Sequence, residues 1–263
     1  MNQALSILFE DEHCLALAKP AGQFTQGTWA PTGEVTLETA VRGYLDPADP
    51  RAVYVGIVHR LDRPTSGVIL WAKTIKAARR LSAQFQGRRV RKEYWAIVEL
   101  RGSVSSRSDP PMETLAPGAK AGEQVWKDWL ARADDSGRAS AVDEGTKGAR
   151  EALTTLSFAG AVALPSGCAW LRLWPHTGRT HQLRIQAARR GMPILGDSIY
   201  GSARPMRQPE GIALHARSLV LHHPASGREM TLLAPCPSWW RDEGIVLPDL
   251  KDRETNSASR GVE

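Results

Sequence analysis

Asp62 is a carboxylate set between two arginines, Arg60 and Arg63, just before the turn-forming segment Pro64-Thr65-Ser66-Gly67. Neighbouring positive charges keep an aspartate ionised, as a nucleophile or an electrostatic stabiliser must be. A structural role, in which Asp62 pairs with the two arginines to fix the turn, fits these residues equally well. The segment marks Asp62 as a candidate catalytic carboxylate and leaves the choice between the two roles open.

A second segment, 175–185, carries groups that suit phosphate. Gly178-Arg179 precedes the expected start of a helix near Thr180, so that backbone N–H groups and a guanidinium would face the same anion. In such a helix His181 and Arg184 lie three positions apart on one face.

A third segment, Arg91 to Val98, alternates as a strand does and places Tyr94 on the opposite face from Trp95. A strand tyrosine usually belongs to the core, with its hydroxyl reaching water. Because basic residues precede it, Tyr94 also fits a role in stacking on a nucleobase.

The composition excludes several classes of protein. The 263 residues carry a net charge of +6 and are 42% hydrophobic, which is enough for a sizeable core and too much for a disordered chain. No apolar run reaches membrane-spanning length, and the first residues carry no basic, leader-like segment, so we expect a cytoplasmic protein.

Neither disulfides nor metal sites are predicted. The three cysteines are odd in number and widely spaced. His176 and His181 do not have the spacing of HExxH, and no acid lies near them in the sequence.

Two stretches are basic and free of acids. Residues 73–92 contain eight Lys or Arg, and residues 171–196 contain five Arg. Such runs are often solvated helix faces. Because both adjoin the segments described above, they favour a surface that faces nucleic acid.

Periodicity and turn residues predict mixed strands and helices without regular alternation, hence an α+β fold built mainly on antiparallel sheet. We expect residues 102–150, which are rich in Ser, Gly, Asp and Pro, to hold short hairpins and loops. Two strands separated by an acidic turn are expected between residues 6 and 19, and residues 53–58 form an apolar run. The other expected strands are 68–72, 90–100, 153–158, 169–174, 214–223 and 230–234, and the expected helices are 36–45, 76–85 and 181–190.

Taken in order, these segments resemble the RluA family of RNA pseudouridine synthases over residues 5 to 235. The motifs that carry the resemblance are Lys19-Pro20-Ala21-Gly22, His59 to Gly67, Lys92-Glu93-Tyr94-Trp95-Ala96, Thr177 to Gly201, Leu214-His215-Ala216 and His223-Pro224.

The resemblance implies a fold and a reaction. The fold is the pseudouridine synthase fold, a central mixed and mainly antiparallel sheet with an RNA-binding cleft. The reaction breaks the N1–C1′ bond of uridine, turns the base and joins C5 to C1′, and it needs no cofactor and no metal. The target uridine, in tRNA or large-subunit rRNA, must be flipped out to reach a buried carboxylate.

The resemblance also implies roles for individual residues. Asp62 is the catalytic carboxylate, which attacks the sugar, attacks the base or removes a proton from the sugar. Arg184 pairs with Asp62 and holds it ionised. Tyr94 packs against the base and assists the final removal of the C5 proton. The residues expected to contact RNA are Arg60, Arg63, Lys92, Arg179 and His181.

The chain departs from the family in three places. Only 18 residues precede Lys19, so we expect no S4 domain and a single catalytic domain over 1–248. Gln23 to Gln26 replace the usual Val-His-Pro ending. Residues 102–150 are interpreted as a variable, substrate-selecting insertion, and 249–263 as a polar, disordered tail.

Two further expectations concern assembly and alternatives. We expect a monomer. The alternative function is an inactive RNA-binding or RNA-chaperone protein on the same fold, and a metal-dependent nuclease is disfavoured because the motif residues are basic rather than acidic.

Overall fold

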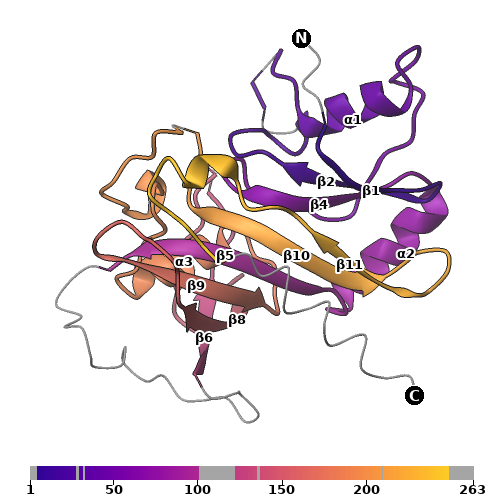
Figure 1. Ribbon diagram of the computed structural model, residues 1–263. Helices are drawn as coiled ribbons and strands as arrows, with labels where there is room; N and C mark the ends of the chain where they lie inside the picture. The colour runs from indigo at the N-terminus through magenta and orange to yellow at the C-terminus, as the bar shows by residue number, and fades with distance from the viewer. Residues whose placement is uncertain are drawn as a thin grey trace, which may run out of the picture.

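Eleven strands form one sheet in the computed structural model, which describes residues 5–27, 30–31, 33–100, 122–134, 137–208 and 210–248. The strand order is β1-β2-β4-β10-β5-β9-β8-β6-β7, with β3 paired to β4 and β11 paired to β10 (Figure 1). The strands are β1 (Ile7–Glu10), β2 (Cys14–Lys19), β3 (Gly56–Ile57), β4 (Ser66–Ala72), β5 (Arg91–Glu99), β6 (Glu123–Leu130), β7 (Ala141–Val142), β8 (Arg150–Ala159), β9 (Cys168–Pro175), β10 (Leu214–His222) and β11 (Glu229–Leu233).

Three α-helices and two short 3₁₀ turns accompany the sheet in the described residues: α1 (Leu37–Leu45), α2 (Ile75–Gln86), α3 (Gln182–Arg189), η2 (Ser198–Tyr200) and η3 (Ser238–Trp240). Thr36 and Thr74 begin α1 and α2, since each side-chain oxygen accepts a hydrogen bond from a backbone N–H of the first turn. None of these helices is both long and apolar enough to cross a membrane.

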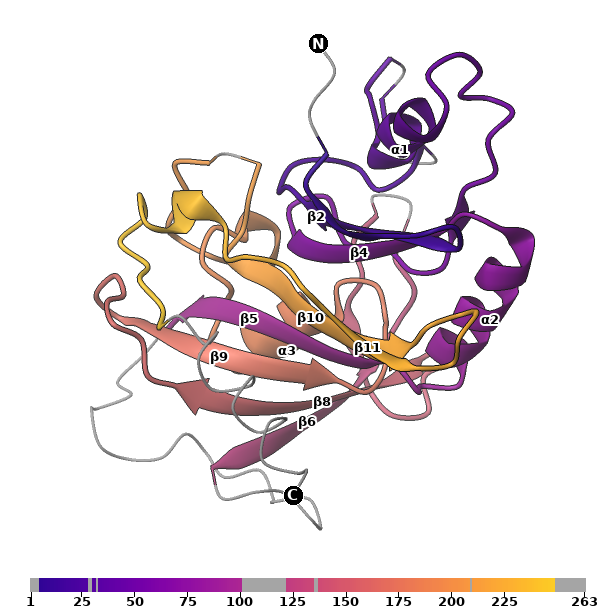
Figure 2. The ribbon, with the colours of Figure 1, turned by 45° about the vertical axis from the view of Figure 1, so that its right-hand side comes forward.

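The first part of the sheet is buried on both faces. On one face Leu37 and Val41 of α1 pack against β2 and β4, and on the other Ala77 and Leu81 of α2 pack against the same two strands. Figures 1 and 2 both show α1 beside β1 and β2 at one end of the molecule. Two-sided burial explains why β2 and β4 are apolar at nearly every position.

The second part of the sheet packs against α3. Leu183 and Ala187 of α3 lie in one apolar cluster with Trp95 of β5, Leu156 of β8 and Leu171 of β9. α3 therefore packs against β5, β8 and β9. Its first turn, which contains Arg184, faces Asp62 in the segment between β3 and β4.

β4 and β10 are the one parallel pair in the described sheet, with Ser66 opposite His215 and Gly67 opposite Ala216. Gly67 has a φ of +120°, and a Cβ at this position would lie 2.2 Å from the carbonyl oxygen of Ala216. Only glycine permits this approach. The Ser66 Oγ is 2.9 Å from His215 Nδ1, which ties the same two strands together.

The α+β prediction is confirmed, and the predicted helices and strands occur within a few residues of their expected positions. The exception among the described residues is β6, an eight-residue strand paired along its length with β8, where short hairpins were expected. Buried Asp128 interrupts the apolar alternation of β6, and for this reason the sequence pattern did not predict the strand. Residues 101–121 and the predicted tail 249–263 lie outside the described residues.

Candidate active site

A cavity of about 530 Å³ opens where the three candidate segments meet. Its walls come from the segment before β4, the end of α2, β5, and the turn from β9 into α3. This volume is within the range of about 300–1,000 Å³ for small-molecule sites. Asp62 is the one carboxylate among the described residues that line it, whereas the lining cations are Arg60, Arg88, Lys92, Arg179 and Arg184.

Lys19 fixes the turn that carries Asp62. Its buried ammonium group donates hydrogen bonds to the carbonyls of Pro20, Arg63 and Thr65, at 2.8 to 3.0 Å. Burial lowers the pKa of Lys19 to about 7, although the charge of Asp62 acts in the opposite direction. In the sequence, Lys19 stands out only as part of a motif. The structure shows that Lys19 holds the turn that contains Asp62.

Arg184 pairs with two aspartates. Its Nε and Nη2 donate to the two carboxylate oxygens of Asp197, at 2.6 and 2.8 Å, in a bidentate pair that is almost fully buried. The third nitrogen, Nη1, lies 3.5 Å from Asp62 Oδ2. Burial acts to lower the pKa of Arg184, but the hydrogen bonds and charge of Asp197 and the charge of Asp62 raise it overall.

The predicted proximity of Arg184 and Asp62 is therefore present, and Asp197 is the stronger partner. Sequence reasoning missed Asp197. Its position in the segment Gly196-Asp197-Ser198-Ile199-Tyr200 was the available signal.

His181 lies beside Asp62 on the cavity wall. Its backbone has a φ of +54°, which is left-handed and uncommon for a residue with a side chain. Its Nδ1 is 2.8 Å from the hydroxyl oxygen of Tyr200, and its Nε2 is 3.9 Å from Asp62 Oδ2. The sequence predicted that His181 contacts phosphate, and the structure places it next to Asp62.

Tyr94 lines the cavity from β5, half-buried. Burial and, to a lesser degree, the charge of Asp62 raise the pKa of its phenol well above its usual value. The phenol is therefore protonated at neutral pH. It suits packing against a base and donating a hydrogen bond better than accepting a proton.

His59, the first residue of the motif that contains Asp62, is held as a neutral imidazole. Its Nε2 accepts the N–H of Leu70 at 2.9 Å, and its ring stacks on Phe85 with 4.7 Å between centroids. Burial and the nearby Lys92 lower the pKa of His59 to about 3. The residue anchors this motif to β4.

Four of the five residues predicted to contact RNA line the cavity: Arg60, Lys92, Arg179 and His181. Arg63 does not. Its Nε donates to the carbonyl of Gly22, its Nη2 pairs with Glu210 at 2.6 Å, and its guanidinium lies over the ring of Phe24. Arg63 therefore stabilises the loop that follows Lys19. The spacing of Arg60 to Arg63 in the sequence does not predict this role.

Residues 13–189 match the family model described as RNA pseudouridylate synthase. The chain belongs to this family. It is an isomerase that converts uridine in RNA to pseudouridine, and the resemblance drawn from its motifs is confirmed.

Several relatives are similar over most of this chain. The tRNA pseudouridine synthase C of Yersinia pestis is 34% identical over 251 residues, covering 90% of this chain and 88% of that protein. The ribosomal large subunit pseudouridine synthase D of Xanthomonas campestris is 32% identical over 249 residues, covering 89% and 66%. The solved structure of human RNA pseudouridylate synthase domain containing 1 has a TM-score of 0.69 at 24% identity, covering 98% and 95%, and shares the fold.

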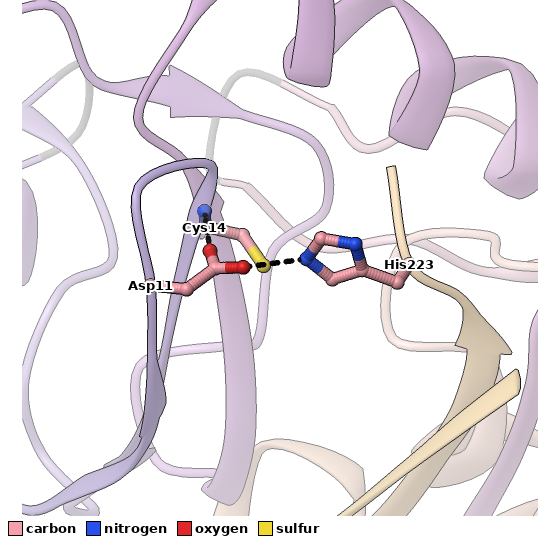
Figure 3. A group of neighbouring side chains, drawn as sticks. All are labelled: Asp11, Cys14 and His223. Atoms are coloured by element: carbon pink, nitrogen blue, oxygen red, sulfur yellow. Dashed lines mark hydrogen bonds and ion pairs between the residues drawn. The ribbon is translucent and has the colours of Figure 1, made fainter. Parts of the chain in front are cut away.

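One cluster away from the cavity has the composition of a metal site: Asp11, Cys14 and His223 (Figure 3). His223 Nδ1 accepts the N–H groups of Ala225 and Ser226, so its proton is on Nε2, which donates to Asp11 at 2.7 Å. A metal-binding imidazole has the opposite arrangement, with one nitrogen free for the metal and the other donating. The cluster does not suit a metal.

The cluster instead connects two turns of the sheet. Asp11 also accepts the backbone N–H of Cys14, between β1 and β2, while His223 follows β10. Burial and the carboxylate of Asp11 raise the pKa of Cys14 to about 12, so its thiol is unreactive.

Proposed function

We propose that this synthase modifies tRNA, with large-subunit rRNA as the second candidate substrate, and that Asp62 is its catalytic carboxylate. The observation that carries the assignment of Asp62 is its position as the one described carboxylate in a cavity of cationic residues, 3.5 Å from a buried arginine. The preference for tRNA is supported by the relatives. Six similar proteins are named tRNA pseudouridine synthase C, at 30% to 34% identity, and the chain covers 61% to 98% of them, whereas one protein named for large-subunit rRNA is 32% identical and covered to 66%.

The target uridine enters the cavity flipped out of its stack. Asp62 acts at the sugar, Arg184 keeps its carboxylate ionised and oriented, and Tyr94 packs against the base. Arg60, Lys92 and Arg179 contact the flanking phosphates with Arg88, which lines the same cavity. One chain supplies all of these groups, so we infer that the enzyme works as a monomer, in the cytoplasm where tRNA is processed.

Nucleotide-resolved mapping of pseudouridine in total RNA tests this proposal. Maps are compared from cells with the wild-type protein, without it, and with Asp62→Asn. A tRNA uridine that loses its modification in both altered strains supports the proposal, and an rRNA uridine with the same behaviour supports the second candidate. Restoration of the modification by Asp62→Asn contradicts the role of Asp62.

Measuring turnover in excess chelator tests whether the reaction requires a metal ion. Because we assign no metal to the reaction, the rate should be unchanged when EDTA is added to the purified protein. A rate that falls with chelator and returns with a divalent cation contradicts the assignment.

A further inference from the structure

The isomerisation must move two protons: one leaves C5 of the base after C5 has joined C1′, and one arrives at N1. A group that accepts the C5 proton has to be unprotonated at neutral pH and has to lie beside the carboxylate that acts on the sugar. The described residues around Asp62 contain one ring nitrogen that meets both conditions.

Tyr200 fixes the tautomer of His181. The Tyr200 hydroxyl donates its single hydrogen to the carbonyl of Ala139 at 3.0 Å. It must then accept, not donate, in its 2.8 Å contact with His181 Nδ1. Nδ1 consequently carries the proton of the neutral imidazole, and Nε2 carries a lone pair.

This lone pair faces Asp62. Nε2 of His181 and Oδ2 of Asp62 are 3.9 Å apart, and both are hydrogen-bond acceptors when the imidazole is neutral. Two acceptors at this separation attract each other only through a proton or a donor group placed between them. The gap between them is thus a position for a substrate hydrogen.

The other groups on the cavity wall are less suited to accept a proton. His59 uses its Nε2 to accept the N–H of Leu70. The phenol of Tyr94 is protonated, and the Lys92 ammonium donates to the carbonyl of Thr177. His176 is exposed, and its Nε2 bonds with Thr155 Oγ1.

We propose that His181 is the general base that removes the C5 proton, an inference that rests on the proposed function. The C5–H proton passes to Nε2, and the electron pair of that bond forms the C5=C6 double bond. The N1=C6 π pair moves to N1, which takes a proton from water. The imidazolium then returns its proton to water, so that one proton has left carbon and one has arrived at nitrogen.

The environment of His181 favours the neutral imidazole, which can accept a proton. The groups that face it are Asp62, Arg184, Asp197 and Tyr200. Burial lowers the pKa of His181 most and the charge of Arg184 adds to this, and together they outweigh the two carboxylates. The left-handed backbone of His181 is strained, and such strain persists only where the surrounding structure requires it. Here it directs the imidazole at Asp62.

The left-handed φ also supplies the sharpest variant, His181→Gly. Glycine adopts this backbone without strain, so the fold is kept while the imidazole is removed and its space is opened. Turnover is measured on an unmodified transcript that contains the uridine identified by mapping, made with ordinary uridine or with deuterium at C5. RNA affinity is measured in parallel.

We expect kcat to fall about 10²- to 10⁴-fold, the usual contribution of a general base, with RNA affinity changed only a few-fold. Deuterium at C5 should slow the variant but not the wild type, because proton removal becomes rate-limiting. Added imidazole should restore turnover of His181→Gly and leave Asp62→Asn inactive.

Two results would overturn the inference. One is wild-type kcat in His181→Gly. The other is a loss that lies in RNA affinity, depends on salt, and shows neither an isotope effect nor rescue, which is the result expected if His181 binds phosphate. Because every value is a ratio to wild-type turnover on the mapped RNA, failure of the tRNA assignment appears in the mapping and does not affect this test.

Discussion

Two carboxylate–histidine pairs in this molecule have opposite arrangements. Between the β1–β2 turn and the end of β10, His223 carries its proton on Nε2 and donates it to Asp11 at 2.7 Å. In the cavity, His181 carries its proton on Nδ1 and presents an unprotonated Nε2 to Asp62 across 3.9 Å. Asp11 and His223 form a closed, hydrogen-bonded pair, called the clasp below, whereas Asp62 and His181 form an open pair with a lone pair on Nε2.

The difference lies in what holds the far nitrogen of each imidazole. Backbone N–H groups bond Nδ1 of His223, whereas the hydroxyl of Tyr200 accepts from Nδ1 of His181. A donor behind the ring makes the front nitrogen a donor, and an acceptor behind the ring leaves the front nitrogen free. The residues behind the histidine therefore decide its chemistry.

The largest expected effect is on turnover, and it should distinguish Asp62 from Asp11. Asp62→Asn should reduce turnover to background while RNA affinity stays within a few-fold, because the substitution removes the charge and keeps the shape. The matched variant Asp11→Asn should turn over at the wild-type rate. Pseudouridine formation on the mapped transcript measures both. Substantial turnover by Asp62→Asn would contradict the catalytic role proposed for Asp62.

Arg184→Ala should damage stability as well as rate. It leaves Asp197, which is 1% exposed, without its bidentate partner, and breaking a buried ion pair in this way costs about 3–5 kcal/mol. Urea unfolding together with turnover provides the measurement. The control is Arg189→Ala on the same helix, where the guanidinium is half exposed and the expected loss is under about 1 kcal/mol. Equal unfolding midpoints for the two variants would contradict the structural importance of the pair.

Tyr200→Phe tests the tautomer of His181 directly. Removing the hydroxyl takes away the acceptor behind the imidazole, so the proton is free to occupy Nε2. We expect kcat to fall about tenfold, equivalent to about 1.4 kcal/mol, the scale of one hydrogen bond. The counterpart on the clasp is Ser226→Ala, which loses a hydroxyl next to His223 Nδ1 and should leave kcat unchanged. Equal kcat values in Tyr200→Phe and wild type would show that the hydroxyl does not set the tautomer.

The smallest effect is a pH dependence of stability that belongs to the clasp. Burial acts to raise the pKa of Asp11, but hydrogen bonds from Cys14, His13 and His223 lower it overall. A carboxyl whose folded pKa is depressed stabilises the protein above its unfolded pKa of about 3.9, and this contribution is lost as the pH falls through the lower folded value. The pH is lowered from about 5 to about 2.5, a range that brackets the unfolded pKa. Over this range the urea midpoint of unfolding should fall less steeply for Asp11→Asn than for wild type. Parallel curves would contradict the shift.

Much of the fold followed from local patterns, because strands such as β8 and helices such as α2 bury one periodic face. β6 was missed because buried Asp128, which is paired with Arg190, occupies an inward position where the pattern requires an apolar residue. Patterning cannot anticipate a buried ion pair whose partner lies 62 positions away in sequence.

The site was predicted at the level of segments and less well at the level of partners. Asp62, Tyr94 and Arg184 lie together as expected. The bidentate bond from Arg184 to Asp197, the three carbonyls around Lys19 and the brace made by Arg63 depend on the path of the chain between distant segments. Residue type and spacing do not contain that information.

The place of β10 in the sheet has a consequence for folding. β10 comes late in the chain but lies between β4 and β5, and its pairing with β4 joins positions 66 and 215. Contacts between such distant positions close large loops and form slowly. During synthesis, which proceeds from the N-terminus, β4 and β5 emerge long before the strand that must separate them. The cavity therefore assembles only when nearly the whole chain is available, and an unfinished chain has no catalytic pocket to offer an RNA.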